Sequence, residues 1–181
     1  MALYTLSDNI LTINAFLNNQ ECLDFITQAE QLGFSSADVA IGSKRVVIED
    51  IRNNARVDWL STSLASIWWE KLKHLNLPKI DNKYPIGLSP RFRFYRYHAG
   101  QKFNMHKDGR QLVDGHQTMM TLLVYLNEDY EGGNTKFRQD NIEIPPQTGK
   151  ALIFEHHKWH QGTKVISGRK YVLRTDLVYG S

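Results

Sequence analysis

The N-terminal half of the chain combines a short strand pattern with two helical patterns. Residues 9–17 alternate polar and apolar side chains as a strand does, whereas apolar residues recur three and four positions apart over residues 20–34. A second helix is predicted over residues 59–77, beginning near Trp59 and packing its aromatic side chains against a sheet. The mixed pattern of residues 35–59 indicates a loop that could include a hairpin.

From Pro90 onward the pattern changes to short β-rich segments separated by turn residues. Short strands at such intervals are typical of a sandwich, a barrel or a jelly roll, with the N-terminal helices covering one face. We therefore expect a mainly β fold in a single domain, residues 1–181, with a helical support region over about 1–89 and a β core over about 90–181. The predicted strands are residues 91–97, 118–127, 132–138, 141–146, 151–156 and 170–179.

Composition narrows the class of protein. With 41% hydrophobic and 23% charged residues the chain has the composition of an ordinary globular protein, and its formal charge of +3 is too small to indicate a nucleic-acid binder. The single cysteine, Cys22, excludes an intramolecular disulfide and a cysteine-based zinc site. The N-terminus has no basic leader and no apolar run reaches about 18 residues, so we expect a cytoplasmic protein without a membrane span.

Two segments carry candidate metal ligands. His106 and Asp108 are two positions apart, so on an extended strand both side chains lean to one side, roughly 6–7 Å apart. A later apolar strand is followed by three histidines, His156, His157 and His160. Two imidazoles and one carboxylate bind one side of an octahedral ion and leave three positions open, the ligand set associated with non-heme Fe(II) oxygenases.

Four segments in order resemble one family, the 2-oxoglutarate- and Fe(II)-dependent dioxygenases, and most closely its prolyl 4-hydroxylase-like branch. The resemblance implies a double-stranded β-helix (jelly roll) packed against the two helices. The histidine directly before Gln-Gly matches the family's distal ligand, so the implied metal ligands are His106, Asp108 and His160. His156 and His157 are then expected to line the entrance or to pack locally. The segments are residues 97–108, 122–137, 145–162 and 168–179.

The family also needs a cation for the far carboxylate of 2-oxoglutarate. With a period of two, Lys170 and Arg174 share one face of the last strand. Lys170 matches the lysine that prolyl 4-hydroxylases use for this carboxylate, and Arg174 is its helper or its rival. Tyr97 occupies the position of the family's cosubstrate tyrosine, and Tyr125 is either a second pocket tyrosine or a core residue.

The chain departs from the collagen-type enzymes at two points. Phe103 stands three residues before the first ligand, where those enzymes commonly have a tyrosine, and residues 170–176 lack their tryptophans. The chemistry is therefore implied more firmly than the substrate. We expect the determinants of substrate choice in the N-terminal half and in the polar loop of residues 107–118.

The resemblance implies an enzyme that couples oxidative decarboxylation of 2-oxoglutarate to hydroxylation of a C–H bond, with release of succinate and CO₂. It needs Fe(II), with 2-oxoglutarate and O₂ as cosubstrates, and ascorbate is an optional addition. A prolyl residue of a protein or peptide is the first choice of substrate, while a lysine, another side chain and a small molecule stay open. The alternatives are a nucleic-acid oxidative demethylase, disfavoured because no basic stripe is present, and a non-catalytic metal-binding jelly-roll module.

Overall fold

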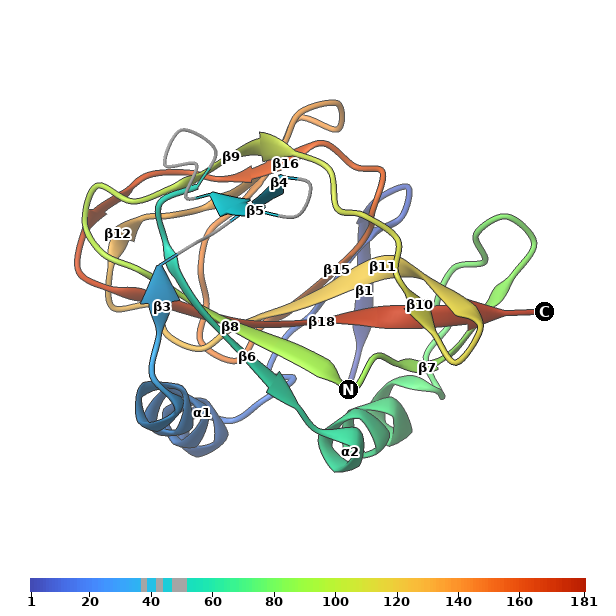
Figure 1. Cartoon of the computed structure of the whole chain (residues 1–181). Coiled ribbons are helices and arrows are strands. Elements are labelled where there is room, and N and C mark those ends of the chain that lie inside the picture. Colours follow the sequence, from blue (N-terminus) through green and yellow to red (C-terminus); the bar gives the residue numbers. More distant parts are fainter. Residues whose placement is uncertain (37–38, 42–43, 47–51) are drawn as a thin grey trace.

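Most strands belong to one large antiparallel sheet, which Figure 1 shows crossing the middle of the molecule. The computed structural model describes residues 1–36, 39–41, 44–46 and 52–181. Strands β11 and β18 are the longest and lie side by side near the centre of this sheet. In spatial order the sheet contains β1 (Leu3–Ser7), β2 (Ile10–Ile13), β15 (Ala151–Glu155), β11 (His116–Tyr125), β18 (Lys170–Gly180), β8 (Arg91–Tyr97), β6 (Ala55–Leu60) and β3 (Ser35–Ser36), with β10 (Leu112–Val113) beside β11 and β7 (Tyr84–Leu88) beside β18.

A smaller sheet lies over one face of the large one, at the top of Figure 1. Two facing sheets of this kind make the predicted jelly roll, and the fold class is confirmed. The small sheet has the order β14 (Ile142–Ile144), β13 (Thr135–Phe137), β16 (His160–Gly162) and β9 (Phe103–His106). Two further pairs are β12 (Glu131–Gly132) with β17 (Val165–Ser167), and β4 (Val39–Ile41) with β5 (Lys44–Val46).

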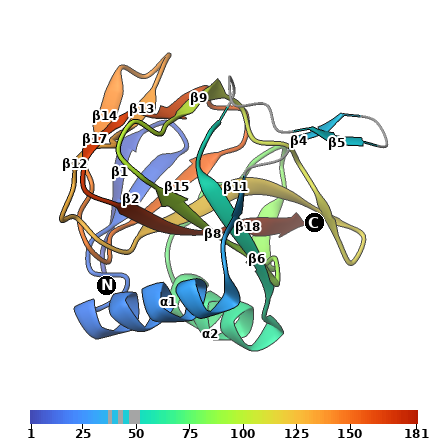
Figure 2. The same cartoon turned by 60° about the vertical axis from the view of Figure 1, so that its left-hand side comes forward.

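Two helices of the described chain cover the opposite face of the large sheet, as Figure 2 shows. Helix α1 (Asn19–Leu32) begins with a capping box in which Asn18 and Glu21 satisfy each other's backbone N–H groups, and it ends at Gly33, whose φ of 82° suits glycine. Helix α2 (Thr62–Leu72) is capped by the side chain of Ser61. Neither helix is long and apolar enough to cross a membrane.

The prediction for the start of the second helix was wrong. We expected this helix to begin near Trp59 after a loop, but Ala55–Leu60 form β6, which pairs with β8 along its whole length. Trp59 therefore packs from a strand, with its ring 6.1 Å from that of Phe94. The apolar pattern that we interpreted as one helix includes the end of strand β6 and helix α2, and the N-cap Ser61 separates the two elements. In residues 35–59 the hairpin that we considered is consistent with the antiparallel pairing of β4 with β5, and residues 42–43 between them lie outside the described residues.

Side-chain alternation along the large sheet builds two separate cores. On β18, Tyr171 and Leu173 belong to the core under the helices, whereas Val172 belongs to the core between the sheets. On β8, Phe92 and Phe94 face the helices, and Tyr95 and Tyr97 face the small sheet. Arg93 on β8 and Lys170 on β18, which are in phase with this second set, are therefore buried between the two sheets.

The six predicted strands are present, but short ones were missed. Strands β9 and β16 have only four and three residues, too few for alternation to identify them. Their positions matter, because they carry two of the three candidate metal ligands, His106 and His160.

Replacing Trp68 tests the packing of the core under the helices. Its side chain is 1% exposed and meets the rings of Phe16, Phe25 and Phe92. We expect Trp68→Ala to lower the free energy of unfolding by about 3–5 kcal/mol because it leaves a large cavity. The neighbouring Ile67 is 56% exposed, so Ile67→Ala should change the free energy of unfolding by only about 0.5 kcal/mol. Denaturant titrations of both variants measure the difference, and equal effects would contradict this packing.

Candidate active site

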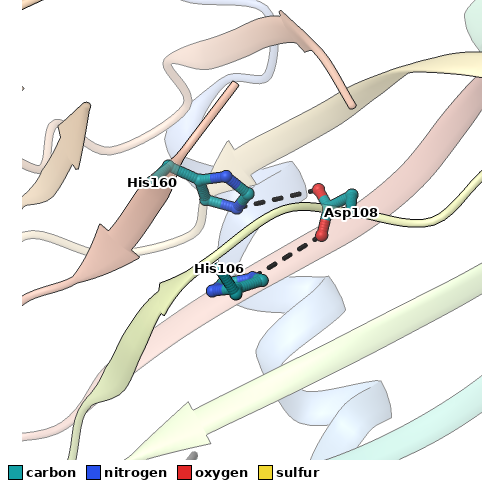
Figure 3. A group of neighbouring side chains, drawn as sticks. All are labelled: His106, Asp108 and His160. Carbon is teal, nitrogen blue, oxygen red and sulfur yellow. Dashed lines mark ion pairs between the residues drawn. The ribbon is translucent and has the colours of Figure 1, made fainter. Parts of the chain in front are cut away.

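Pairing of β9 with β16 brings two of the predicted ligands together. His106 and His160 are direct partners across this antiparallel pair, and their ring centroids are 4.3 Å apart. Residues opposite each other in such a pair have Cβ atoms about 4.5–5.5 Å apart, so the register alone makes these rings neighbours. Figure 3 shows the two imidazoles and the carboxylate of Asp108 converging between the strands.

Asp108 completes the cluster from a position just beyond β9. Its Oδ1 lies 3.6 Å from Nε2 of His106, and its Oδ2 lies 3.7 Å from Nε2 of His160. One potential ligand atom from each residue lies within 4.8 Å of the other two, which is the scale of one ion's coordination sphere. The structure therefore brings the three predicted ligands together, although Asp108 is not on the strand that we expected to carry it.

Hydrogen bonds orient both imidazoles for a metal. Nδ1 of His106 lies 2.6 Å from the carbonyl oxygen of Asn104, and Nδ1 of His160 lies 2.9 Å from that of Lys158. A ring nitrogen facing a carbonyl must carry the proton, so Nε2 is left as the lone-pair donor on each ring and points toward Asp108. This donor set of two neutral nitrogens and one carboxylate fits Fe(II).

The protonation states also suit a metal. Burial lowers the pKa of His160 to about 4, although the nearby Asp108 acts in the opposite direction. Burial would raise the pKa of Asp108, but the guanidinium of Arg174 and the two imidazoles outweigh it and hold that pKa well below its usual range. Neither His160 nor Asp108 therefore has to lose a proton at neutral pH before it can bind a cation.

A narrow cavity of about 40 Å³ begins at this cluster and runs between the sheets. Lys170 and Arg174 both line it from β18, and their positions on that strand are about 13 Å apart. Arg174 lies beside Asp108, so Lys170 marks the far end. A Cβ placed on Gly162 would lie 3.7 Å from Nζ of Lys170 and 3.8 Å from the hydroxyl of Tyr97. The absence of that side chain keeps this end of the cavity open.

Lys170 is a buried cation without an anionic partner among the described residues. It is 3% exposed, donates to the carbonyl oxygen of Gly133 at 2.7 Å, and lies 4.8 Å from the ring centroid of Tyr97. Burial lowers its pKa to about 7. An ammonium group has three donors and a charge to compensate, so the carboxylate of a ligand is the group that this end of the cavity lacks.

The two predicted tyrosines have different surroundings. Tyr97 lines the cavity, and it pairs across the strands with Lys170. Tyr125 is fully buried, and its hydroxyl lies 2.6 Å from that of Thr135, which is itself part of the cavity wall. Tyr125 therefore supports the wall from behind, as the core alternative expected, and reaches the cavity through Thr135.

Arg174 binds two carboxylates. Nη1 donates to Oδ1 of Asp108 at 2.9 Å, and Nη2 donates to Oδ1 of Asp176 at 3.0 Å. Its guanidinium thus lies at the metal end of the cavity, whereas we had considered it as a helper or rival of Lys170.

Two further features of the site were missed from the sequence. Thr121 donates to Oδ2 of Asp108 at 2.6 Å, and Asp176 has the partners described above. Asp176 is two positions after Arg174, so alternation along β18 predicts the same inward face for it, and this signal could have found it.

The other two histidines are not in the cluster. His156 is fully buried and its Nε2 lies 3.2 Å from Oδ1 of Asp176, so it packs locally as expected. His157 is exposed. His160 is therefore the member of the three that faces His106 and Asp108.

Comparison with known proteins agrees with the class that this fold and site define. The profile of a family described as the 2OG-Fe(II) oxygenase superfamily matches residues 92–175. This match and the relatives below make the chain similar to this superfamily and to its prolyl 4-hydroxylase-like branch, and they support an oxidoreductase of the hydroxylase type.

Individual relatives support the same grouping. A putative prolyl 4-hydroxylase of Acanthamoeba polyphaga mimivirus is 26% identical over an alignment of 182 positions, which covers 88% of this chain and 70% of the relative. The viral collagen prolyl hydroxylase of Paramecium bursaria Chlorella virus-1, solved with 2-oxoglutarate, has the same fold, with a TM-score of 0.66, 22% identity and coverage of 97% and 98%. A Trichoplax adhaerens prolyl hydroxylase, solved with a peptide of hypoxia inducible factor, has a TM-score of 0.74, 19% identity and coverage of 95% and 84%.

Replacing any residue of the cluster should remove the metal site. We expect His106→Ala, Asp108→Ala and His160→Ala each to weaken Fe(II) binding by more than about 100-fold, because loss of a direct ligand exceeds the 10–100-fold effect of an outer partner. His157→Ala is the matched control, since it removes an exposed imidazole from the same segment and should leave the affinity unchanged. Anaerobic calorimetric titration measures each affinity. Loss of binding in His157→Ala with retention in His160→Ala would show that the wrong histidine was chosen.

Proposed function

We propose that this oxygenase hydroxylates a prolyl residue of a protein or peptide and that one cavity holds both Fe(II) and 2-oxoglutarate. The observation that carries the proposal is the pairing of a His-Asp-His cluster at one end of the cavity with a buried, uncompensated ammonium group at the other. A dicarboxylate with a 2-oxo group can bind a metal with one end and a cation with the other. The residues present fit both groups.

His106, Asp108 and His160 would hold the iron. The carbonyl groups of Asn104 and Lys158 keep the proton on Nδ1 of each imidazole, so Nε2 is free to bind. When bound, the iron would supply the redox chemistry by which O₂, 2-oxoglutarate and a substrate C–H bond are converted to succinate, CO₂ and a C–OH group, one oxygen atom going to succinate and the other to the substrate. The protein's part is to orient these reactants and to exclude water from a narrow cavity.

Lys170 and Tyr97 would bind the far carboxylate of 2-oxoglutarate. The two residues are cross-strand partners, and Nζ of Lys170 and the hydroxyl of Tyr97 both lie near Gly162 at the end of the cavity. The ammonium would supply the charge and the phenol a hydrogen bond, which is the usual way to stabilise a buried carboxylate. Thr135, backed by Tyr125, forms the adjoining wall.

The surroundings of the iron ligands support a peptide substrate. Trp159, directly before His160, is partly exposed, and Nζ of Lys107 lies 5.3 Å from its ring centroid. A partly exposed aromatic ring next to a ligand in the sequence can pack against a pyrrolidine ring. The mimivirus relative carries the name of a prolyl 4-hydroxylase, and the Trichoplax neighbour was solved with a peptide. These observations favour a prolyl substrate over a nucleic acid or a small molecule.

Residues 1–181 would act as one catalytic domain in the cytoplasm. The large sheet contributes to both cores, which favours a single unit. The only cysteine, Cys22, is buried and unpaired, which fits a reducing compartment. Ascorbate would serve as a reductant that returns the iron to the ferrous state, and omitting it from assays tests this role.

Lys170 makes 2-oxoglutarate binding depend on pH. Burial lowers its pKa from 10.5 to about 7, so the folded chain binds fewer protons than the unfolded chain between these values, and the Lys170 contribution to stability rises with pH in that window. A bound carboxylate favours the ammonium and raises the pKa. Binding should therefore take up a proton, and the affinity should fall by up to about tenfold per pH unit as the pH rises above about 7.

Calorimetry under anaerobic conditions, in buffers of different ionisation enthalpy, measures this proton uptake. Lys170→Met should abolish the uptake and weaken 2-oxoglutarate binding by about 2–5 kcal/mol, or roughly 30-fold to several-thousand-fold. Lys136→Met, which removes an exposed lysine from β13, should change neither. Unaltered proton uptake in Lys170→Met would place the anchor elsewhere.

A turnover assay tests the proposed substrate. The protein is supplied with Fe(II), 2-oxoglutarate and O₂ together with a proline-containing peptide, a lysine-containing peptide without proline, or a methylated single-stranded DNA. We expect succinate formation to rise at least about tenfold only with the proline peptide, and that peptide should gain one oxygen atom. Demethylation of the DNA would establish the nucleic-acid alternative. Metal binding without any consumption of 2-oxoglutarate would indicate a non-catalytic module.

A further inference from the structure

We propose that Arg174 is a positioning residue that holds Asp108 in place as a metal ligand and that it does not bind 2-oxoglutarate. The inference rests on the proposed function, because it takes Asp108 to be an iron ligand. It goes further by assigning a role to Arg174 within a buried network behind the metal site that also contains His156 and Asp176.

Asp108 needs such a support because regular structure does not hold it. Strand β9 ends at His106, and Asp108 lies in the irregular segment that precedes Gly109. Three hydrogen bonds hold Asp108 in place of strand pairing. The backbone N–H of Asp108 donates to the carbonyl oxygen of His156 at 3.0 Å, and its carboxylate accepts from Arg174 at 2.9 Å and from Thr121 at 2.6 Å. The orientation of this ligand is therefore set by residues of other strands and loops.

These contacts form a closed network around Asp108. His156 holds the backbone of Asp108 and also places Nε2 3.2 Å from Oδ1 of Asp176. The same Asp176 oxygen accepts a hydrogen bond from Arg174 at 3.0 Å, and Arg174 also donates to the carboxylate of Asp108. Asp176 and His156 are 1% and 0% exposed, so solvent cannot replace a missing member. The main chain and the side chain of Asp108 are thus both tied to one rigid cluster.

Cross-strand register explains why the network lies here. Arg174 of β18 is paired with Arg93 of β8, and Asp176 is paired with Thr121 of β11. These strands are adjacent in the large sheet, so their inward side chains form one layer between the sheets. Nη1 of Arg93 lies 3.7 Å from Oδ2 of Asp176 and completes the layer.

The charges in this layer balance. The two guanidinium groups of Arg93 and Arg174 face the two carboxylates of Asp108 and Asp176, while Lys170 at the other end faces no carboxylate in the described part of the chain. A cation already held between two carboxylates has little charge left for a third, whereas an uncompensated ammonium attracts one strongly. The two cations on one strand face therefore have different tasks. Arg174 serves the metal ligand and Lys170 serves the cosubstrate.

The test compares two neighbouring arginines. Arg174→Met should weaken anaerobic Fe(II) binding by about 10–100-fold, the effect typical of losing an outer partner of a ligand. Once the protein is saturated with metal, 2-oxoglutarate affinity should stay within about threefold of the wild type, a change of less than 1 kcal/mol. Arg93→Met is the matched control, since Arg93 also faces Asp176 but has no contact with Asp108 among the described residues. The Fe(II) affinity of Arg93→Met should stay within about threefold of the wild type, even if its melting temperature falls as much as that of Arg174→Met.

Two further variants keep the test decisive. Arg174→Lys retains the charge but cannot bridge two carboxylates, so it should recover only part of the Fe(II) affinity. The double variant Arg174→Met with Asp176→Asn leaves the remaining charges balanced and guards against a failure to fold. It should still bind Fe(II) about 10–100-fold more weakly.

Distinct outcomes overturn the inference. Loss of 2-oxoglutarate affinity in Arg174→Met with unchanged Fe(II) affinity would make Arg174 a cosubstrate anchor. A lower melting temperature with unchanged Fe(II) affinity would make it a purely structural residue. If the wild type does not bind Fe(II), or if Asp108→Ala binds it as tightly as the wild type does, the proposed function fails. If Asp108→Ala loses Fe(II) binding but Arg174→Met binds Fe(II) as tightly as the wild type, only the role of Arg174 fails.

Discussion

The site depends on the pairing of two very short strands. Four residues of β9 and three of β16 place His106 opposite His160 and hold the two imidazoles side by side. The other neighbour of β16 is β13, whose Thr135 lines the cavity. The small sheet thus supplies both histidines and one wall, and the large sheet supplies the cations. The site exists only where the two sheets face each other.

Burial decides what the charged residues between the sheets can do. Arg174 and Lys170 share one face of β18 and the same cavity. Among the described residues, Arg174 donates to two carboxylates and Lys170 to a single carbonyl group. The opposite shifts in their pKa values follow from this. Burial would lower the pKa of Arg174, yet Asp108 and Asp176 hold it well above its ordinary value, whereas burial lowers that of Lys170 without opposition. One strand therefore offers a satisfied cation at one end and an unsatisfied one at the other.

Local pattern predicted much of this arrangement, because alternation along β18 and β8 determines which residues face the interior. The inward position of Lys170 and the choice of His160 followed from local pattern and motif, and both residues lie in the same cavity. The partners of Arg174 could not be predicted in this way. They depend on the register between β18, β11 and β8, in which Asp176 meets Thr121 and Arg174 meets Arg93. The placement of Asp108 beyond the end of β9 also depends on tertiary contacts.

The central claim is that the His-Asp-His cluster and Lys170 bind two ends of one molecule. Anaerobic absorption spectroscopy tests it most directly, because a 2-oxo acid chelated to Fe(II) absorbs visible light. The account predicts that adding 2-oxoglutarate to the Fe(II)-loaded protein produces a saturable band with one binding site per chain, and that succinate, which has no 2-oxo group, produces none. Binding of 2-oxoglutarate without such a band, or equally tight binding in the absence of Fe(II), would contradict it.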